Sequence, residues 1–156
     1  LSTGSGRRFR SVYELLLIPG MDADRFRRLK PHVTVYDNGK INLNIASATV
    51  LTCLGRAVGG DADIAESLAR KVVSFRNQNS FANPTPPAII QELRGSVQLL
   101  SAEETLLGDM LGYMTLNSRC FAGTAEGNVG DGGSGATRVD FVFDRDRGIG
   151  LYWHEY

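Results

Sequence analysis

Histidine, the side chain that most often moves protons in catalysis, occurs twice in this sequence. His32 follows a proline in a predicted turn, and His154 lies on a predicted strand. Neither has a serine, a cysteine or a second histidine at the spacing of a catalytic motif, although a triad can also assemble from residues far apart in sequence. We therefore predict no catalytic residue and no enzymatic activity, because a hydrolase would need a deep pocket that holds perturbed acids or histidines.

Paired carboxylates are the groups in this sequence that could bind a metal ion. Asp144, Asp146 and Gly148 are similar to the start of a calcium loop, and Asp61 and Asp63 form a second acidic pair. The charged tips of turns show the same spacing of acidic side chains, and this spacing alone does not define a calcium loop. We predict no metal ligands and no cofactor, with calcium as a candidate ion whose ligands are not assigned.

The Gly-rich stretch and the two cysteines are typical of structural roles. Residues 130–135 lack the lysine and the Ser/Thr of a phosphate-binding loop, so we predict a mobile crossing loop over the whole stretch 127–135. Cys53 and Cys120 match no zinc or redox spacing. We expect two small buried side chains, with a disulfide in an oxidising compartment as the alternative.

The composition indicates a globular protein with no excess charge. The 156 residues include 42% hydrophobic side chains, enough for one ordinary domain or two small subdomains. Lys plus Arg number 17 and Asp plus Glu number 17, and this balance argues against nucleic acid as the main partner. No apolar run approaches the roughly 20 residues that span a bilayer, and the longest compact one is Leu15–Ile18. We expect any membrane anchor to lie before residue 1.

The elements that position these residues follow from caps and periodicity. Ser11 and Glu14 form a capping box for a short helix that Pro19 ends. Asp22 is a suitable N-cap for a second short helix, which Pro31 ends. Together they predict two short helices joined by a tight turn.

Further helices are expected along the rest of the first 111 residues. One contains Val50 and Leu51 and ends at Gly59-Gly60, and Asn side chains before it are expected to bond local backbone and cap it. A long amphipathic helix is predicted from residue 61 to 77, and a shorter one passes through Ile89. A second capping box over Ser101–Glu104 predicts a last helix.

The last third of the chain alternates with the period of strands. We predict three antiparallel strands, through residues 114–120, 139–143 and 149–153, with a charged hairpin between the last two. Alternation groups Trp153 with Ile149 and Leu151, so we expect it in the core. Tyr152 and Tyr156 share the other face and are the candidate partner-interface residues.

Two segments resemble helix-hairpin-helix units. One is the "ELLLIPGM" segment that starts at Glu14 and runs through Leu29, and the other starts with "INLNIAS" at Ile41 and runs to Phe75. Together with "LKPHVTV" between them and "FDRDRG" and "LYWHEY" at the end, this order resembles the K-class minor pseudopilin of bacterial type II secretion. The resemblance covers nearly the whole chain from Ser11 on.

The resemblance implies an α+β fold and a role in assembly. Residues 1–10 would be a flexible segment, residues 11–111 a SAM-like helical insertion, and residues 112–156 the antiparallel strands of a pilin-like domain. It also implies the periplasmic domain of an inner-membrane protein in a Gram-negative bacterium, with an N-terminal membrane helix before residue 1. Such a protein caps the pseudopilus tip with the I- and J-class minor pseudopilins and the secretion apparatus as partners.

A helix-hairpin-helix DNA-binding module is the alternative function. Competence proteins that bind DNA share the "INLN" segment, and Arg25, Arg27, Arg28 and Lys30 form a basic run. The zero net charge and the acids of both hairpins argue against it, because carboxylates repel phosphate. We therefore predict no nucleic-acid partner.

Overall fold

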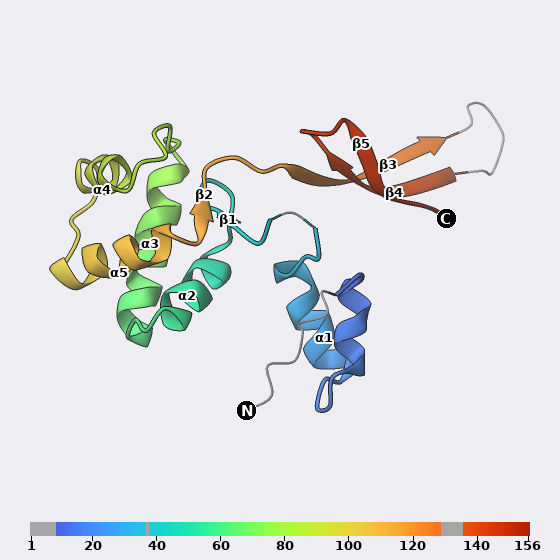
Figure 1. Cartoon of the computed structure of the whole chain (residues 1–156), viewed down its shortest axis with the longest axis horizontal. Helices are drawn as coiled ribbons and strands as arrows, with labels where there is room; N and C mark the ends of the chain where they lie inside the picture. Colours follow the sequence, from blue (N-terminus) through green and yellow to red (C-terminus); the bar gives the residue numbers. More distant parts are fainter. Residues whose placement is uncertain (1–8, 37, 129–135) are drawn as a thin grey trace. The chain divides into compact units, whose positions relative to one another are not determined.

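The computed structural model describes residues 9–36, 38–128 and 136–156 (Figure 1). The chain divides into two compact units, residues 1–116 and 117–156. The first unit is helical with one short pair of strands, and the second is a three-stranded sheet. The predicted mixture of helix and sheet is therefore confirmed.

The first unit begins with a pair of short helices. They are the 3-10 helix η1 (Val12–Leu17) and the α-helix α1 (Ala23–Leu29), followed by a 3-10 turn, η2 (Lys30–His32). The predicted capping box is present, because the Ser11 hydroxyl accepts from the Tyr13 amide and the Glu14 carboxylate accepts from the Ser11 amide. Asp22 caps α1 by accepting from the Arg25 amide at 2.8 Å, as predicted.

Four further helices enclose the main core. They are α2 (Ala48–Ala57), α3 (Ala62–Arg76), α4 (Pro86–Arg94) and α5 (Ser101–Leu111). Leu51, Leu68 and Leu107 are completely buried among them, and α3 packs against both α2 and α5. The long helix predicted from residue 61 to 77 is confirmed as α3, with Asp61 as its N-cap.

The local caps before α2 and α5 differ from those expected. Ser47, rather than an asparagine, caps α2 by accepting from the Val50 amide. Before α5 the N-cap position is Leu100, whose amide donates to Glu103. The predicted capping box over Ser101–Glu104 is thus wrong by one residue, because Glu104 instead pairs with Arg94.

The strand predicted over residues 114–120 is wrong as a single strand. Met114–Thr115 forms the short strand β2, which pairs in parallel with β1 (Ile41–Asn42) inside the first unit. A separate strand, β3, begins at Cys120. Alternation continues through the whole segment, so it does not reveal that the two ends pair with different partners.

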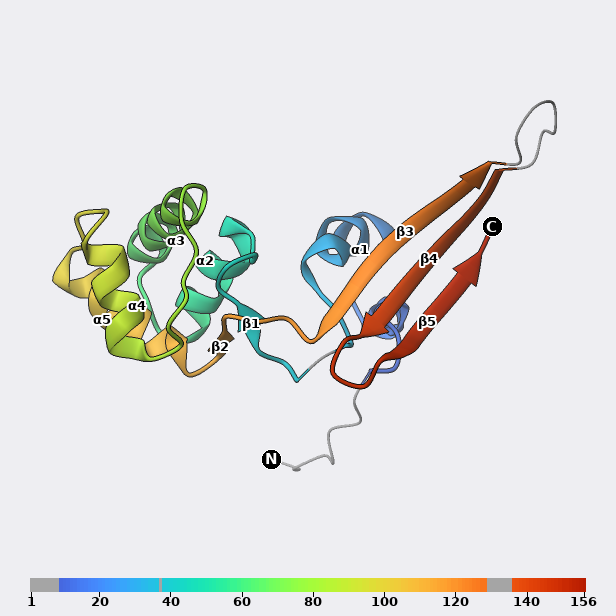
Figure 2. The ribbon, with the colours of Figure 1, turned by 90° about the horizontal axis from the view of Figure 1, so that it is seen from above.

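The second unit is an antiparallel sheet with the order β3-β4-β5 (Figure 2). Its strands are β3 (Cys120–Asn128), β4 (Ala136–Asp144) and β5 (Ile149–Glu155). The predicted charged hairpin joins β4 and β5, and Gly148 takes a φ of 66° there. Of the predicted crossing loop, Gly127 and Asn128 belong to β3, and residues 129–135 lie outside the described residues.

Candidate functional site

The strand register gathers large apolar side chains on one face of the sheet. Phe121 pairs with Phe143, and Phe141 pairs with Trp153. Since directly paired residues point to the same side of a sheet, these side chains share a face with Val139. We call Phe121, Val139, Phe141, Phe143 and Trp153 the apolar sheet face.

Much of the apolar sheet face is open to solvent. Phe121 is 46%, Phe143 39% and Trp153 66% exposed, and Phe141 lies 6.4 Å from Trp153 between ring centroids. A Cβ on Gly123 would come within 2.6 Å of the Phe141 ring, so the glycine lets this ring lie flat on β3. The described residues of the second unit form no element that covers this face.

The prediction that Trp153 belongs to a core is therefore wrong. A β-bulge near Val142 and Phe143 shifts the register, so that Ile149 pairs with Asp144 and no longer shares a face with Trp153. Alternation alone did not reveal the change of face at the bulge, and it does not show whether another layer covers a face.

The opposite face of the sheet is polar and aromatic. Tyr152 and Tyr156, the predicted partner-interface residues, lie here with His154, whose ring meets Tyr156 edge-on at 4.5 Å. Asp140 accepts from the Thr124 hydroxyl and from the Tyr156 hydroxyl, and these bonds, that of Thr124 foremost, lower the pKa of Asp140. Tyr152 is 43% and Tyr156 67% exposed, and their contact with a partner stays a prediction.

The acids of the β4–β5 hairpin are engaged in the turn. Asp144 is completely buried, and its Oδ1 accepts from the amides of Asp146 and Arg147. Its Oδ2 lies 3.2 Å from a guanidinium nitrogen of Arg119, and Asp146 pairs with Arg145. These donors compete with any cation. Within the described ranges, no group of three or more His, Cys, Asp or Glu side chains could hold a metal ion.

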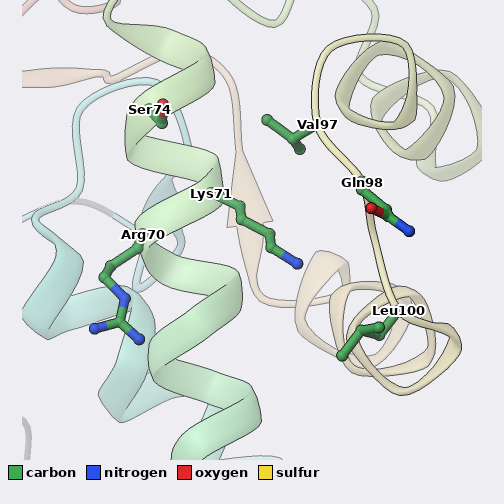
Figure 3. A pocket seen from close by; sticks show the side chains of 6 residues that line it. All are labelled: Arg70, Lys71, Ser74, Val97, Gln98 and Leu100. Atoms are coloured by element: carbon green, nitrogen blue, oxygen red, sulfur yellow. The ribbon is translucent and has the colours of Figure 1, made fainter.

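A groove of about 630 Å³ lies between α3 and the segment that leads into α5 (Figure 3). It is lined by Arg70, Lys71, Ser74, Val97, Gln98 and Leu100. In Figure 3, Lys71 extends from α3 toward this segment, and its ammonium lies 2.6 Å from the Glu103 carboxylate. Arg70 pairs with Glu66, so an ion pair already engages each basic side chain of the groove.

Glu103 is the buried acid behind this groove. It is completely buried and accepts from Lys71, the Ser67 hydroxyl and the Leu100 amide. Burial alone would raise the pKa of Glu103, but these bonds and the charge of Lys71 together lower it. No sequence motif indicated this role of Glu103. The signal that the sequence offers is the pair Ser67 and Lys71, two donors one helical turn apart on α3.

The "INLN" segment holds the first unit together. The Asn44 side chain donates to the carbonyls of Phe81 and Leu116 and accepts from the Phe81 amide. The Asn42 side chain accepts from the Asn44 amide at 2.9 Å. Asn44 therefore joins distant backbone segments, where the sequence predicted local bonds.

Both predicted hairpins carry an aspartate where a phosphate would bind. Asp61 accepts from the amides of Asp63 and Ile64 at the start of α3, and Asp22 does the same for the Arg25 amide at the start of α1. Free amides at a helix N-terminus are the groups that bind phosphate. These carboxylates occupy such amides and add negative charge.

Each unit holds one of the two histidines and one of the two cysteines. His32 and His154 are both exposed, and they belong to different units. Cys53 is exposed and Cys120 partly buried, and both are free thiols. The expectation that both cysteines are buried is therefore wrong for Cys53, which lies on the outer side of α2.

Comparisons with known proteins identified no relative of this chain. A scan against protein-family models, a search of curated proteins and a search of solved structures each found no match. Among the described residues, no helix has both the length and the apolarity needed to cross a bilayer.

Proposed function

We propose that this chain is a non-enzymatic minor pseudopilin of the K class, which acts by docking its sheet to other minor pseudopilins. The observation that carries the proposal is the apolar sheet face. Phe121, Phe143 and Trp153 are aromatic, neighbouring and exposed on a sheet that buries only one hydrophobic residue, Val142, among the described residues of its unit. Exposed apolar patches of this kind mark interaction surfaces.

The sheet needs a second layer for energetic reasons. A stable domain buries the apolar face of a sheet against another element, and a small sheet is marginal without such packing. A partner that covers Trp153 and its neighbours would supply this layer. Aromatic side chains are also the residues that most often dominate binding energy at interfaces.

The helical unit supports a further part of the proposal, that the chain terminates the pseudopilus. Its helices α2 to α5 share one core, and we infer that it is the SAM-like insertion of a pilin-like protein. Its bulk would prevent another subunit from stacking above it, which would terminate the pseudopilus. On this proposal the chain works in the periplasm, its partners are the I- and J-class minor pseudopilins, and a preceding helix supplies the membrane anchor.

DNA binding is the weaker alternative. The N-cap aspartates, Asp22 and Asp61, occupy the hairpin amides that a phosphate would need. Asn44 of the "INLN" segment is used inside the unit. The basic run on α1 is the one feature that favours DNA, and Asp22 and Asp24 partly neutralise it.

A pull-down with the periplasmic domains of I- and J-class minor pseudopilins tests the proposal. The expected result is association that Trp153→Ser and Phe143→Ser each weaken about tenfold or more, because exposed aromatic anchors lose contact area. Tyr113→Ser is the matched control, since Tyr113 is an aromatic side chain of the helical unit that is 57% exposed. Tyr156→Ser tests the opposite face separately.

The outcomes separate the functions. Absence of association, or association that neither sheet variant weakens, contradicts docking through the apolar sheet face. A loss caused by Tyr156→Ser alone would move the interface to the other face. Tight binding to a DNA duplex that weakens steeply with salt would favour the alternative function.

A further inference from the structure

The turn between η1 and α1 exposes consecutive aliphatic side chains. Leu16 is 41%, Leu17 81% and Ile18 40% exposed, and Tyr13 beside them is 57% exposed. Three exposed apolar residues in a row are unfavourable in water unless they have a function. They also form the longest compact apolar stretch of the sequence together with Leu15.

The geometry of the turn makes these side chains protrude. Leu16 and Leu17 are the last residues of η1, and they point in different directions because three residues complete one turn of a 3-10 helix. Ile18 follows as the C-cap with an extended backbone. The turn itself is closed by the bond from the Met21 amide to the Ile18 carbonyl at 3.0 Å. Figure 1 shows this turn at one end of the pair formed by η1 and α1. The aliphatic group therefore forms a tip at which Leu17 is largely uncovered, with the partly exposed Leu16 and Ile18 beside it.

Basic side chains flank this tip. Arg25 donates to the Gly20 carbonyl, which holds its guanidinium at the turn, and it also pairs with Asp22. Arg28 follows one helical turn later along the sequence of α1. Residues 9–32 carry five Arg and Lys against three Asp and Glu, a net charge of +2, whereas the whole chain is neutral. The exposed aliphatic residues thus lie in a positively charged part of the chain.

We propose that this tip inserts into the interface of an anionic lipid bilayer. Aliphatic side chains beside Arg and Lys are the composition of segments that lie in the headgroup region, and anionic lipids attract such basic groups. Tyr13 suits the same boundary, because its ring is apolar and its hydroxyl, bonded to Lys30 at 2.8 Å, is polar. This contact would be additional to any membrane helix before residue 1, and it does not depend on the proposed docking function.

The same residues fit DNA less well. Leu17 and Ile18 offer nothing to a phosphate, and the amides of Ile18, Met21 and Arg25 are bonded within the helical pair. A protein partner would need a groove that receives three side chains pointing in different directions. A bilayer interface has no such requirement, because it surrounds the tip.

Vesicle flotation with the full chain tests the proposal. Vesicles of phosphatidylcholine with phosphatidylglycerol should bind the chain, and vesicles of phosphatidylcholine alone should bind it much more weakly. Leu17→Ser should weaken binding to these vesicles about tenfold, because it removes the leucine side chain that would be buried in the bilayer interface. Arg25→Gln with Arg28→Gln should weaken it further and reduce its salt dependence.

Matched variants distinguish insertion from adsorption. Leu100→Ser, a change of another leucine that is 53% exposed, should leave binding unchanged. The only tryptophan is Trp153, so Leu17→Trp in a Trp153→Phe background reports the tip alone. Its emission should shift to the blue on the anionic vesicles, and that of Leu100→Trp in the same background should not.

Three results would overturn the proposal. They are no flotation with anionic vesicles, flotation that Leu17→Ser does not weaken, and an unchanged emission of the Leu17→Trp variant. If the chain binds a DNA duplex and Leu17→Ser does not weaken that binding, the basic side chains would instead form a nucleic-acid site. Circular dichroism of each variant checks that the variant folds. Leu17 is 81% exposed, so its replacement should not disturb the fold.

Discussion

Two polar side chains of the helical unit, the buried Glu103 and the half-buried Asn44, make contacts that no sequence motif indicates. Glu103 accepts from three donors in a completely buried position, and Asn44 joins the Phe81 and Leu116 backbones to its own segment. A buried polar group that loses its partners costs far more than an exposed one. We therefore expect these two residues to be the most sensitive polar positions of this unit.

Replacing Glu103 should destabilise the chain in a pH-dependent way. Glu103→Gln should lower the free energy of unfolding by about 2–4 kcal/mol near neutral pH, because one amide oxygen cannot serve three donors and the charge opposite Lys71 is lost. Glu66→Gln is the matched control: its pair with Arg70 is exposed and should contribute less than about 1 kcal/mol. Urea unfolding measures both.

The pH dependence follows from the lowered pKa of Glu103. A carboxylate whose pKa is lower in the folded than in the unfolded chain stabilises the fold above the unfolded pKa, here near 4.5. This contribution is lost as the pH falls through the folded pKa. The difference in stability between the parent chain and Glu103→Gln should therefore shrink between about pH 5 and about pH 3. A constant difference across that range would contradict the assignment.

Asn44→Ala should disrupt the junction of three backbone segments. It leaves the Phe81 amide and two carbonyls without the Asn44 side chain, and we expect a loss of about 2–3 kcal/mol in the free energy of unfolding. Asn77→Ala, at the exposed end of α3, should change stability by less than about 0.5 kcal/mol. Thermal unfolding of both variants checks the contrast, and equal losses would argue against the junction.

At the scale of elements, a glycine of α2 lies in close contact with α3. A Cβ on Gly55 would lie 2.9 Å from the Ala65 Cβ, closer than such atoms normally approach. One helical turn later Gly59 takes a φ of 98°, which ends α2 and directs the chain toward α3. The hairpin therefore depends on one glycine for its packing and on another for its turn.

A pair of glycine variants separates packing from helix propensity. Gly55→Ala should lower the free energy of unfolding by about 1–3 kcal/mol, because the added methyl group forces α2 and α3 apart. Gly108→Ala in α5 should raise it by about 0.5–1 kcal/mol, because nothing lies within 4 Å of the new Cβ and alanine favours the helix. If both changes stabilise the chain, the close approach at Gly55 does not limit packing.

At the scale of the whole molecule, the two units differ in how much they bury. The helical unit buries a core that extends from Leu43 to Leu116, whereas the described part of the sheet unit buries Val142 and the Asp144 carboxylate. Hydrophobic burial is the main favourable term in folding. The sheet unit should therefore be the less stable of the two until a partner covers its apolar face.

Amide hydrogen exchange tests this difference. Amides of β3 to β5 should exchange on the order of tenfold or more faster than those in the middle of α3, because local opening of the sheet exposes little additional apolar surface. Addition of the I- and J-class partners should slow exchange in β3 to β5 and leave α3 unchanged. Equal protection of both units without partners would contradict the expectation.

The sequence by itself determined the features that depend on near neighbours. The Ser11–Glu14 capping box, the Asp22 cap, the helix α3 and the β4–β5 hairpin were all predicted. A capping bond joins residues two to four positions apart, and an amphipathic stripe repeats within one helix. Such signals are complete within a short window of sequence.

Only the tertiary structure decided which distant segments meet and which faces stay open. Ser67 and Glu103 are 36 residues apart, Asn44 and Phe81 are 37 apart, and β2 pairs with β1 rather than continuing into β3. Trp153 likewise alternates like a core residue, yet it is 66% exposed, because the described part of its unit forms no layer over the apolar sheet face. These contacts result from the packing of the whole chain, which no local pattern encodes.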